Sequence, residues 1–192
     1  MEGIRKQKIY YNIKKGYMVR RAMPGDEPGN MITRIVENGM NVDEVHINWL
    51  EGRSNSIYTI GRAYKDKPYR VLCLELMNED GDICVIQTDL RTNAATDIIL
   101  RWENIDHSQP WTILTGYKKD RLFAWIEQGP ADKEGRRPKV KKLYTKDDPR
   151  DKPQWRQIEK DGVQVWDRTA ELRWLELKLL EFDSALRSTP SV

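Results

Sequence analysis

Apolar and polar residues alternate along most of this chain, and a period of two is typical of β-strands. Turn residues divide the alternating stretches, among them Lys15-Gly16 and Asn38-Gly39. The pattern therefore predicts a mainly β protein. The predicted strands lie at residues 8–22 (a pair), 31–36, 42–50, 56–64, 69–77, 83–90, 109–128 (a pair) and 140–144.

Two segments instead repeat their apolar residues at helical spacing. Residues 93–102 form the shorter one, and residues 169–186 form a Leu-rich one that Asp167 can cap. We expect the longer helix either to pack on the sheet or to pair with another copy. The predicted apolar positions are Ala94, Ala95, Ile98, Ile99 and Trp102 in the first helix, and Leu172, Leu175, Leu179, Phe182 and Leu186 in the second.

The order of three strands, a helix and two strands is that of a five-stranded oligonucleotide-binding (OB) barrel. The predicted fold is therefore α+β: an OB-like barrel with an N-terminal strand and hairpin extension and a C-terminal amphipathic helix. Residues 1–55, 56–145 (the barrel with a basic arm) and 146–192 would form one compact domain. A small mixed α/β sandwich can have a similar order of strands and helices, so it remains an alternative fold.

The last predicted strand combines aromatic and basic side chains on one face. Arg121, Phe123 and Trp125 point to that face, and the turn before them adds Lys118 and Lys119. Unpaired nucleic acid needs such a surface, because bases stack on rings and phosphates bind cations. An ordinary half-buried strand has the same pattern, so both interpretations remain open here.

Two other aromatic residues receive different assignments. Trp111 alternates with Ile113 and is expected in the core. Tyr69 begins the hairpin that turns at residues 78–81, and lies on the outer face where OB barrels receive bases. If that turn is symmetric, the leucines of the hairpin share the inner face with Ile83 and Val85.

Composition predicts a soluble protein with a cytoplasmic location. Of 192 residues, 33% are charged, and no apolar run approaches the length of a membrane span. Residues 1–8 carry no apolar stretch typical of a secretory signal. Cys73 and Cys84 are too few for a disulfide framework or a four-cysteine zinc site.

Basic residues are concentrated in two segments of the chain, although the net charge of the whole chain is only +3. Residues 1–21 hold seven Lys/Arg and one Glu, and residues 117–142 hold nine Lys/Arg and four acids. One electropositive surface that binds phosphates would explain this, as would two solvated basic segments. The phosphate-contact candidates are Arg20, Arg21, Lys118, Lys119, Arg121, Arg136 and Arg137.

No residue pattern predicts an enzyme, a metal site or a cofactor. His46 and His107 have no second ligand at metal-binding spacing. The chain has no Gly-rich phosphate loop and no nucleophile elbow. We therefore assign no catalytic residue.

The order of segments resembles a family of phage-encoded single-stranded DNA-binding proteins with an OB-fold. The motifs that carry this resemblance are Lys15-Gly16-Tyr17-Met18-Val19-Arg20-Arg21, Glu37-Asn38-Gly39-Met40, and Leu100 followed by Asn104-Ile105-Asp106-His107-Ser108. The resemblance implies sequence-tolerant binding of single-stranded DNA in phage replication or recombination, in the host cytoplasm, with replication or recombination proteins as partners. One feature departs from it, because residues 168–192 balance four basic against four acidic side chains, whereas such proteins often end in an acidic tail.

The predicted nucleic-acid interface thus combines stacking rings with phosphate-binding cations. A structural or adaptor protein that uses its C-terminal helix, and an RNA-binding OB module, are the alternatives. No contact with a membrane is expected. The predicted interface residues are Arg20, Arg21, Tyr69, Lys118, Lys119, Arg121, Phe123, Trp125, Arg136 and Arg137.

Overall fold

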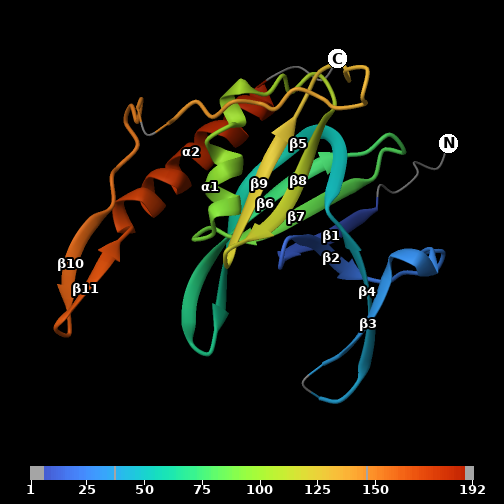
Figure 1. The fold of residues 1–192 in the computed structure, drawn as a ribbon, viewed down its shortest axis with the longest axis horizontal. Coiled ribbons are helices and arrows are strands. Elements are labelled where there is room, and N and C mark those ends of the chain that lie inside the picture. The colour runs from blue at the N-terminus through green and yellow to red at the C-terminus, as the bar shows by residue number, and fades with distance from the viewer. Residues whose placement is uncertain (1–6, 37, 146, 189–192) are drawn as a thin grey trace.

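A computed structural model describes residues 7–36, 38–145 and 147–188 of the protein. Residues 1–6, 37, 146 and 189–192 lie outside this range, and Glu37 of the predicted Asn-Gly hairpin is among them. The fold is α+β, with one large sheet, two α-helices and a separate hairpin (Figure 1). The elements are β1 (Lys8–Lys14), β2 (Tyr17–Arg21), β3 (Met31–Ile35), β4 (Asn41–Ile47), β5 (Trp49–Tyr64), β6 (Lys67–Met77), β7 (Ile83–Asp89), α1 (Asn93–Ile99), β8 (Trp111–Lys118), β9 (Arg121–Glu127), β10 (Arg156–Lys160), β11 (Val163–Asp167) and α2 (Thr169–Ser188), with 3₁₀ turns at Pro28–Asn30 and Trp102–Asn104.

Nine strands form the large sheet, in the order β3-β4-β2-β1-β7-β6-β5-β8-β9. All neighbours are antiparallel except β1 and β7, which run parallel. The segments predicted as barrel strands are therefore consecutive in space, as β7-β6-β5-β8-β9. The N-terminal strands extend the same sheet from β7.

The sheet is mixed and open, not a closed barrel. Closure would require β7 to pair with β9, but β7 pairs with β1. The predicted α+β class is confirmed, whereas the predicted five-stranded OB-like barrel is not formed as a closed barrel. Alternation along each strand indicates which face is apolar, but it carries no information about which edges meet, so a pairing between distant strands cannot be read from it.

Strand β5 connects the two halves of the sheet. Its first residues pair with β8 and its later residues pair with β6, with a bulge between Ser54 and Ser56. A bulge bends a strand and increases its twist. The strand therefore crosses the predicted boundary between residues 1–55 and residues 56–145 without interruption.

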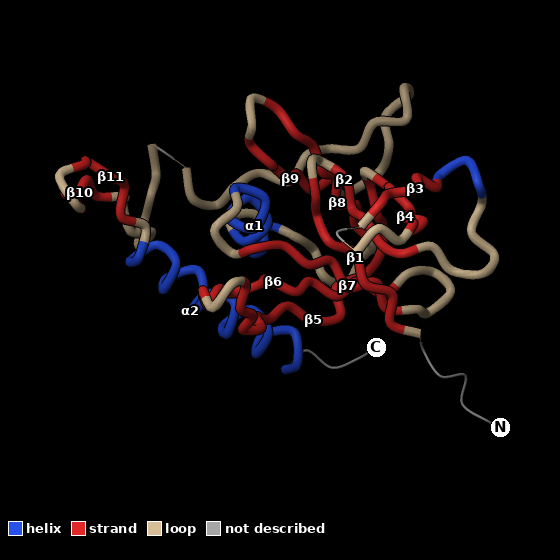
Figure 2. Tube along the Cα trace, turned by 90° about the horizontal axis from the view of Figure 1, so that it is seen from below, coloured by secondary structure: helices blue, strands red, loops and turns tan. Residues whose placement is uncertain are grey.

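The main core lies between the sheet and the helices, and Trp102 lies at its centre. The Trp102 ring packs 6.2 Å from that of Trp111 and 6.0 Å from that of Phe182 on α2. Trp111 is fully buried, so its predicted core position is confirmed. Figure 2 shows α2 alongside β5 and β6, and its Leu175, Leu179 and Phe182 side chains are buried there. The predicted inner face of this helix therefore packs on the sheet, while Leu177 and Leu180 remain exposed.

The register of the β6–β7 hairpin differs by one residue from the symmetric prediction. Leu74 faces Ile86 and Leu76 faces Cys84, whereas Ile83 and Val85 lie on the other side. The turn contains an extra residue, since Asn78 and Asp82 pair through their backbones and Gly81 takes a positive φ of 84°. One inserted turn residue moves every side chain of the returning strand to the opposite face.

The hairpin β10–β11 was not predicted. Its Asp161-Gly162 turn is a strong hairpin signal that the polar composition of this segment obscured. The strand expected at residues 140–144 is absent from the described chain, which forms only a bridge between Glu127 and Lys139 there. None of the described helices has both the length and the apolar character needed to cross a membrane.

Candidate nucleic-acid interface

Three two-residue turns of the large sheet share one unusual composition. Each places two residues at positive φ, as hairpins with this loop length require: Lys15 and Gly16, Lys65 and Asp66, and Lys119 and Asp120. Lysine is rare in the left-handed region, where glycine or asparagine is less strained. An exposed tyrosine also lies next to each turn: Tyr17, Tyr64 and Tyr117.

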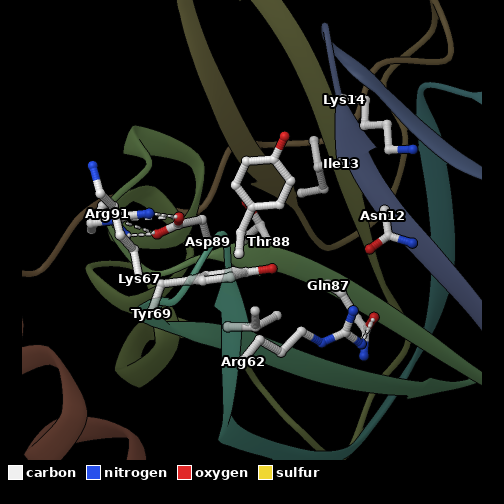
Figure 3. A pocket seen from close by; sticks show the side chains of 12 residues that line it. Asn12, Ile13, Lys14, Arg62, Lys67, Tyr69, Gln87, Thr88, Asp89 and Arg91 are labelled. Atoms are coloured by element: carbon white, nitrogen blue, oxygen red, sulfur yellow. Dashed lines mark hydrogen bonds and ion pairs between the residues drawn. The ribbon is translucent and has the colours of Figure 1, made fainter. Parts of the chain in front are cut away.

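A cavity of about 420 Å³ opens between the β5–β6 hairpin, β7 and β1, and we call it the turn groove (Figure 3). Tyr69 lies across its floor, and the exposed Tyr64 lines it as well. The residues that line the groove are Asn12, Ile13, Lys14, Arg62, Tyr64, Lys67, Tyr69, Val71, Gln87, Thr88, Asp89 and Arg91. Tyr69 lies on the face of β6 that points away from the main core, as predicted, and its contact with bases stays a prediction.

The turn groove is strongly positive, because four basic side chains face one carboxylate, Asp89. Asp89 is bound by Arg91, whose guanidinium also lies 5.7 Å from the Tyr69 ring centroid. Burial opposes ionisation of Asp89, but the Arg91 hydrogen bonds outweigh burial and hold the Asp89 pKa below its ordinary value. Arg62 donates a hydrogen bond to Gln87 at 3.0 Å, and its side chain is otherwise exposed.

A second basic cleft lies between the β8–β9 turn and α1, which packs against the edge strand β9. We call it the helix-side cleft. It brings together the predicted residues Lys118, Lys119, Arg121 and Phe123. Lys142 completes it, and Asp97 is its one carboxylate, bound by Lys142 and by Arg101.

The β1–β2 turn connects the turn groove to the β8–β9 turn. Lys14 lines the groove, and two residues later Gly16 packs against β8. Thr115 donates a hydrogen bond from Oγ1 to the Gly16 carbonyl at 2.8 Å. A Cβ on Gly16 would lie 2.9 Å from the Tyr117 backbone nitrogen, so only glycine permits this contact. The β1–β2 turn thus lies beside the turn groove through Lys14 and against β8 through Gly16, and we call the three turns together the basic border.

Phe123 and Trp125 are neither fully exposed nor core residues. Their rings stack on each other at 5.6 Å, and Phe123 covers Gly116, where a Cβ would lie 2.7 Å from the ring. Lys139 lies 5.5 Å from the centroid of the Trp125 ring. Both residues are half-buried, so the prediction that their rings stack on bases stays a prediction.

Four predicted arginines lie elsewhere. Arg20 forms a paired contact with Asp26 and is largely buried, and its hydrogen bonds lower the Asp26 pKa to about 2. Arg21 is exposed on β2, where it faces Glu44 across the strands. Arg136 pairs with Glu134, and Arg137 with Glu51 at 2.9 Å, on the arm after β9.

Several residues that the structure brings to these two clefts and to the border between them, Lys15 among them, were not predicted from the sequence. They come from turns and strand ends that are distant in sequence, so no local pattern marked them as a group. The sequence does contain a local pattern that marks the three turns. Each turn begins with a lysine followed by Gly or Asp, at residues 15–16, 65–66 and 119–120, and each has a tyrosine within two residues of it. The missed residues also include Lys14, Arg62, Tyr64, Lys65, Lys67, Arg91 and Lys142.

The hydrogen-bonded pair Ser54 and His107 has a structural explanation. Trp111 donates its indole N–H to the Ser54 hydroxyl at 2.9 Å, and that hydroxyl lies 2.7 Å from His107 Nδ1. His107 Nε2 lies 3.1 Å from the Trp102 carbonyl, which can only accept, so Nε2 carries the proton and Nδ1 accepts from Ser54. Burial lowers the His107 pKa, and the chain of bonds joins β5, β8 and the Trp102 turn.

No set of three or more His, Cys, Asp and Glu side chains within residues 7–36, 38–145 and 147–188 is arranged to hold a metal ion. The chain matches no protein-family model, no curated protein and no solved structure. The geometry of its own surface is therefore the basis for a functional assignment.

Proposed function

We propose that this protein binds single-stranded DNA without strict sequence preference, through the turn groove and the helix-side cleft. The observation that carries the proposal is the convergence of tyrosines and basic side chains from three separate turns on one border. Cations on both clefts bind phosphates, and the rings of Tyr64 and Tyr69 stack on bases.

The distribution of charge supports an extended polyanion as the ligand. Each cleft offers four basic side chains against one carboxylate, and that carboxylate is already paired. A small anion would need only one such cluster, whereas a nucleic-acid strand contacts cations along a path. The β1–β2 turn supplies Lys14 and Lys15 between the two clefts, which keeps this path continuous.

The exposed rings favour an unpaired strand over a duplex. Tyr64 is 63% exposed at the rim of the turn groove, and the Tyr69 ring forms its floor. Bases of a duplex are stacked on one another and do not present their faces to a protein. Unpaired bases do, and any base serves because each has a flat π surface.

We further propose that the segment from β5 to β9 is an opened form of the OB-fold. The order β7-β6-β5-β8-β9, with α1 between β7 and β8, supports this relation. The β5–β6 and β8–β9 turns would then be the two loops with which OB-folds contact oligonucleotides. A role in phage replication or recombination follows only from the family resemblance and remains part of the proposal.

A fluorescence titration tests the DNA-binding proposal. The chain has seven tryptophans, and oligo-dT should quench their fluorescence with an affinity that falls steeply as salt rises. Oligo-rU and a duplex of equal length serve as comparisons, with weaker binding expected for the duplex. Absence of oligo-dT binding at low salt would refute the proposal, and tighter binding of oligo-rU would replace it with RNA binding.

A further inference from the structure

The β10–β11 hairpin is a two-stranded sheet that stands apart from the large sheet. Within the part of the chain that the structure describes, its strands pair only with each other, and it lies beyond the N-terminal end of α2 (Figures 1 and 2). An isolated two-stranded sheet is marginally stable in water. The hairpin nevertheless exposes Ile158, Val163 and Trp166, at 41%, 60% and 58%.

The base of the hairpin is held firmly by the start of α2. Trp155 donates its indole N–H to Glu171 at 2.8 Å, and the Arg168 guanidinium lies 4.6 Å from the Trp155 ring centroid. Trp166 packs edge-on against Trp155 at 6.3 Å. The strands are therefore presented in a fixed orientation, with the outer edge of each one unpaired by any described strand.

We propose that β11 pairs with β11 of a second copy of this chain, antiparallel and about a two-fold axis at Val165. This pairing joins two marginal two-stranded hairpins into one four-stranded sheet, which exceeds the three strands that a sheet with a hydrophobic face needs for independent stability. Val165 faces Ile158 within each hairpin, so the pairing creates a continuous aliphatic row across all four strands. An identical edge on each copy is what a two-fold interface requires.

Charge selects β11 over β10 as the pairing edge. A two-fold axis at Val165 opposes Val163 to Asp167 and Gln164 to Trp166, so no like charges meet. The equivalent axis at Ile158 on β10 would oppose Arg156 to Lys160 twice. Like charges directly opposite each other destabilise a sheet.

The pairing uses none of the residues that line the turn groove or the helix-side cleft. It therefore stands independently of the DNA-binding proposal. If both hold, each dimer carries two copies of the basic border.

Sedimentation velocity over a wide concentration series tests the pairing. The full chain should sediment as a dimer that dissociates on dilution. Val165→Lys opposes two ammonium groups at the axis and should shift the protein to a monomer, and Val165→Glu should do the same. Mixing equal amounts of the two variants opposes Lys to Glu and should restore the dimer, which a misfolded hairpin could not do.

Ile158→Lys is the matched control, because it places the same charge on the same face of the hairpin but on β10. It should retain most of the dimer. A monomer at every concentration would overturn the proposal. So would a dimer that survives Val165→Lys, or one that only Ile158→Lys abolishes, since the copies would then associate through another surface.

Discussion

Tyr64 offers the cleanest test of base stacking, since its ring is 63% exposed and contributes little to the core. A stacked base is worth about 1–3 kcal/mol, so Tyr64→Ala should weaken binding of oligo-dT by about 5-fold to 150-fold. The salt dependence of the affinity should not change, because no charge is removed. The free energy of unfolding should stay within about 0.5 kcal/mol of the wild-type value, as for other surface substitutions.

Tyr10→Ala provides the matched control. Tyr10 is 48% exposed on β1 but does not line the turn groove. Fluorescence anisotropy with a labelled oligo-dT measures both affinities without relying on the protein's own fluorescence, and urea unfolding measures both stabilities. An affinity unchanged by Tyr64→Ala, or reduced equally by Tyr10→Ala, would refute stacking in the groove.

Further predictions address the charges and the interior. Replacing both Lys118 and Lys119 by Gln removes two phosphate contacts. A plot of the logarithm of the oligo-dT binding constant against the logarithm of the salt concentration should then become shallower by about 1.4, since each contact contributes about 0.7. An unchanged slope would show that this turn does not contact the DNA. Lys65→Gly should raise the free energy of unfolding by up to about 1 kcal/mol, because glycine adopts the left-handed backbone conformation of this position without strain. The same substitution should weaken oligo-dT binding, because it removes a positive charge. A lower free energy of unfolding would contradict the proposed strain. Ser54→Ala should lower the free energy of unfolding, measured in urea, by at least about 2 kcal/mol, because Trp111 Nε1 and His107 Nδ1 both lose their hydrogen-bond partner. A loss under about 0.5 kcal/mol would mean that water replaces the hydroxyl. Burial lowers the His107 pKa below that of the unfolded chain, which is near 6.5, so this contribution to stability is complete above pH 6.5 and should fall as the pH drops below it, by at most about 1.4 kcal/mol per pH unit. His107→Gln should flatten this dependence in urea unfolding, and an unchanged pH profile would refute the assignment.

Alternation of residue types predicted most of the strands and both helices, because it depends only on which face of each element is buried. The β8–β9 pair, α1 and the apolar face of α2 follow from this local rule. Partner choice does not follow from it. Strand β7 could meet either β9 or β1, and the alternation of β7 is the same in both cases.

The predicted register of the β6–β7 hairpin was wrong because strand composition does not determine the length of the turn. The β6–β7 turn contains five residues between paired ends where the prediction assumed four, and Gly81 takes the extra position. The one additional turn residue therefore places each side chain of β7 on the face of the sheet opposite to the predicted one. Turn chemistry, and not strand composition, carries that information.

The candidate interface was only partly predictable, because it is assembled from turns that are distant in sequence. Lys118, Lys119 and Arg121 were found from one strand pair, and Tyr69 from another. What joins them is the contact of Gly16 with Tyr117, which no periodicity indicates.

The three turns connect stability with the proposed function. A two-residue hairpin is least strained with glycine or asparagine at its centre, yet this chain has lysine at one of the two central positions in all three turns. Each such lysine costs folding free energy, and its charge is exposed where a hairpin tip can reach a ligand. Left-handed lysines at all three turns of the basic border fit the binding proposed there, because each of these lysine side chains is exposed. The basic arm at residues 129–142 differs from this surface, because its Arg136 and Arg137 already pair with carboxylates of the protein.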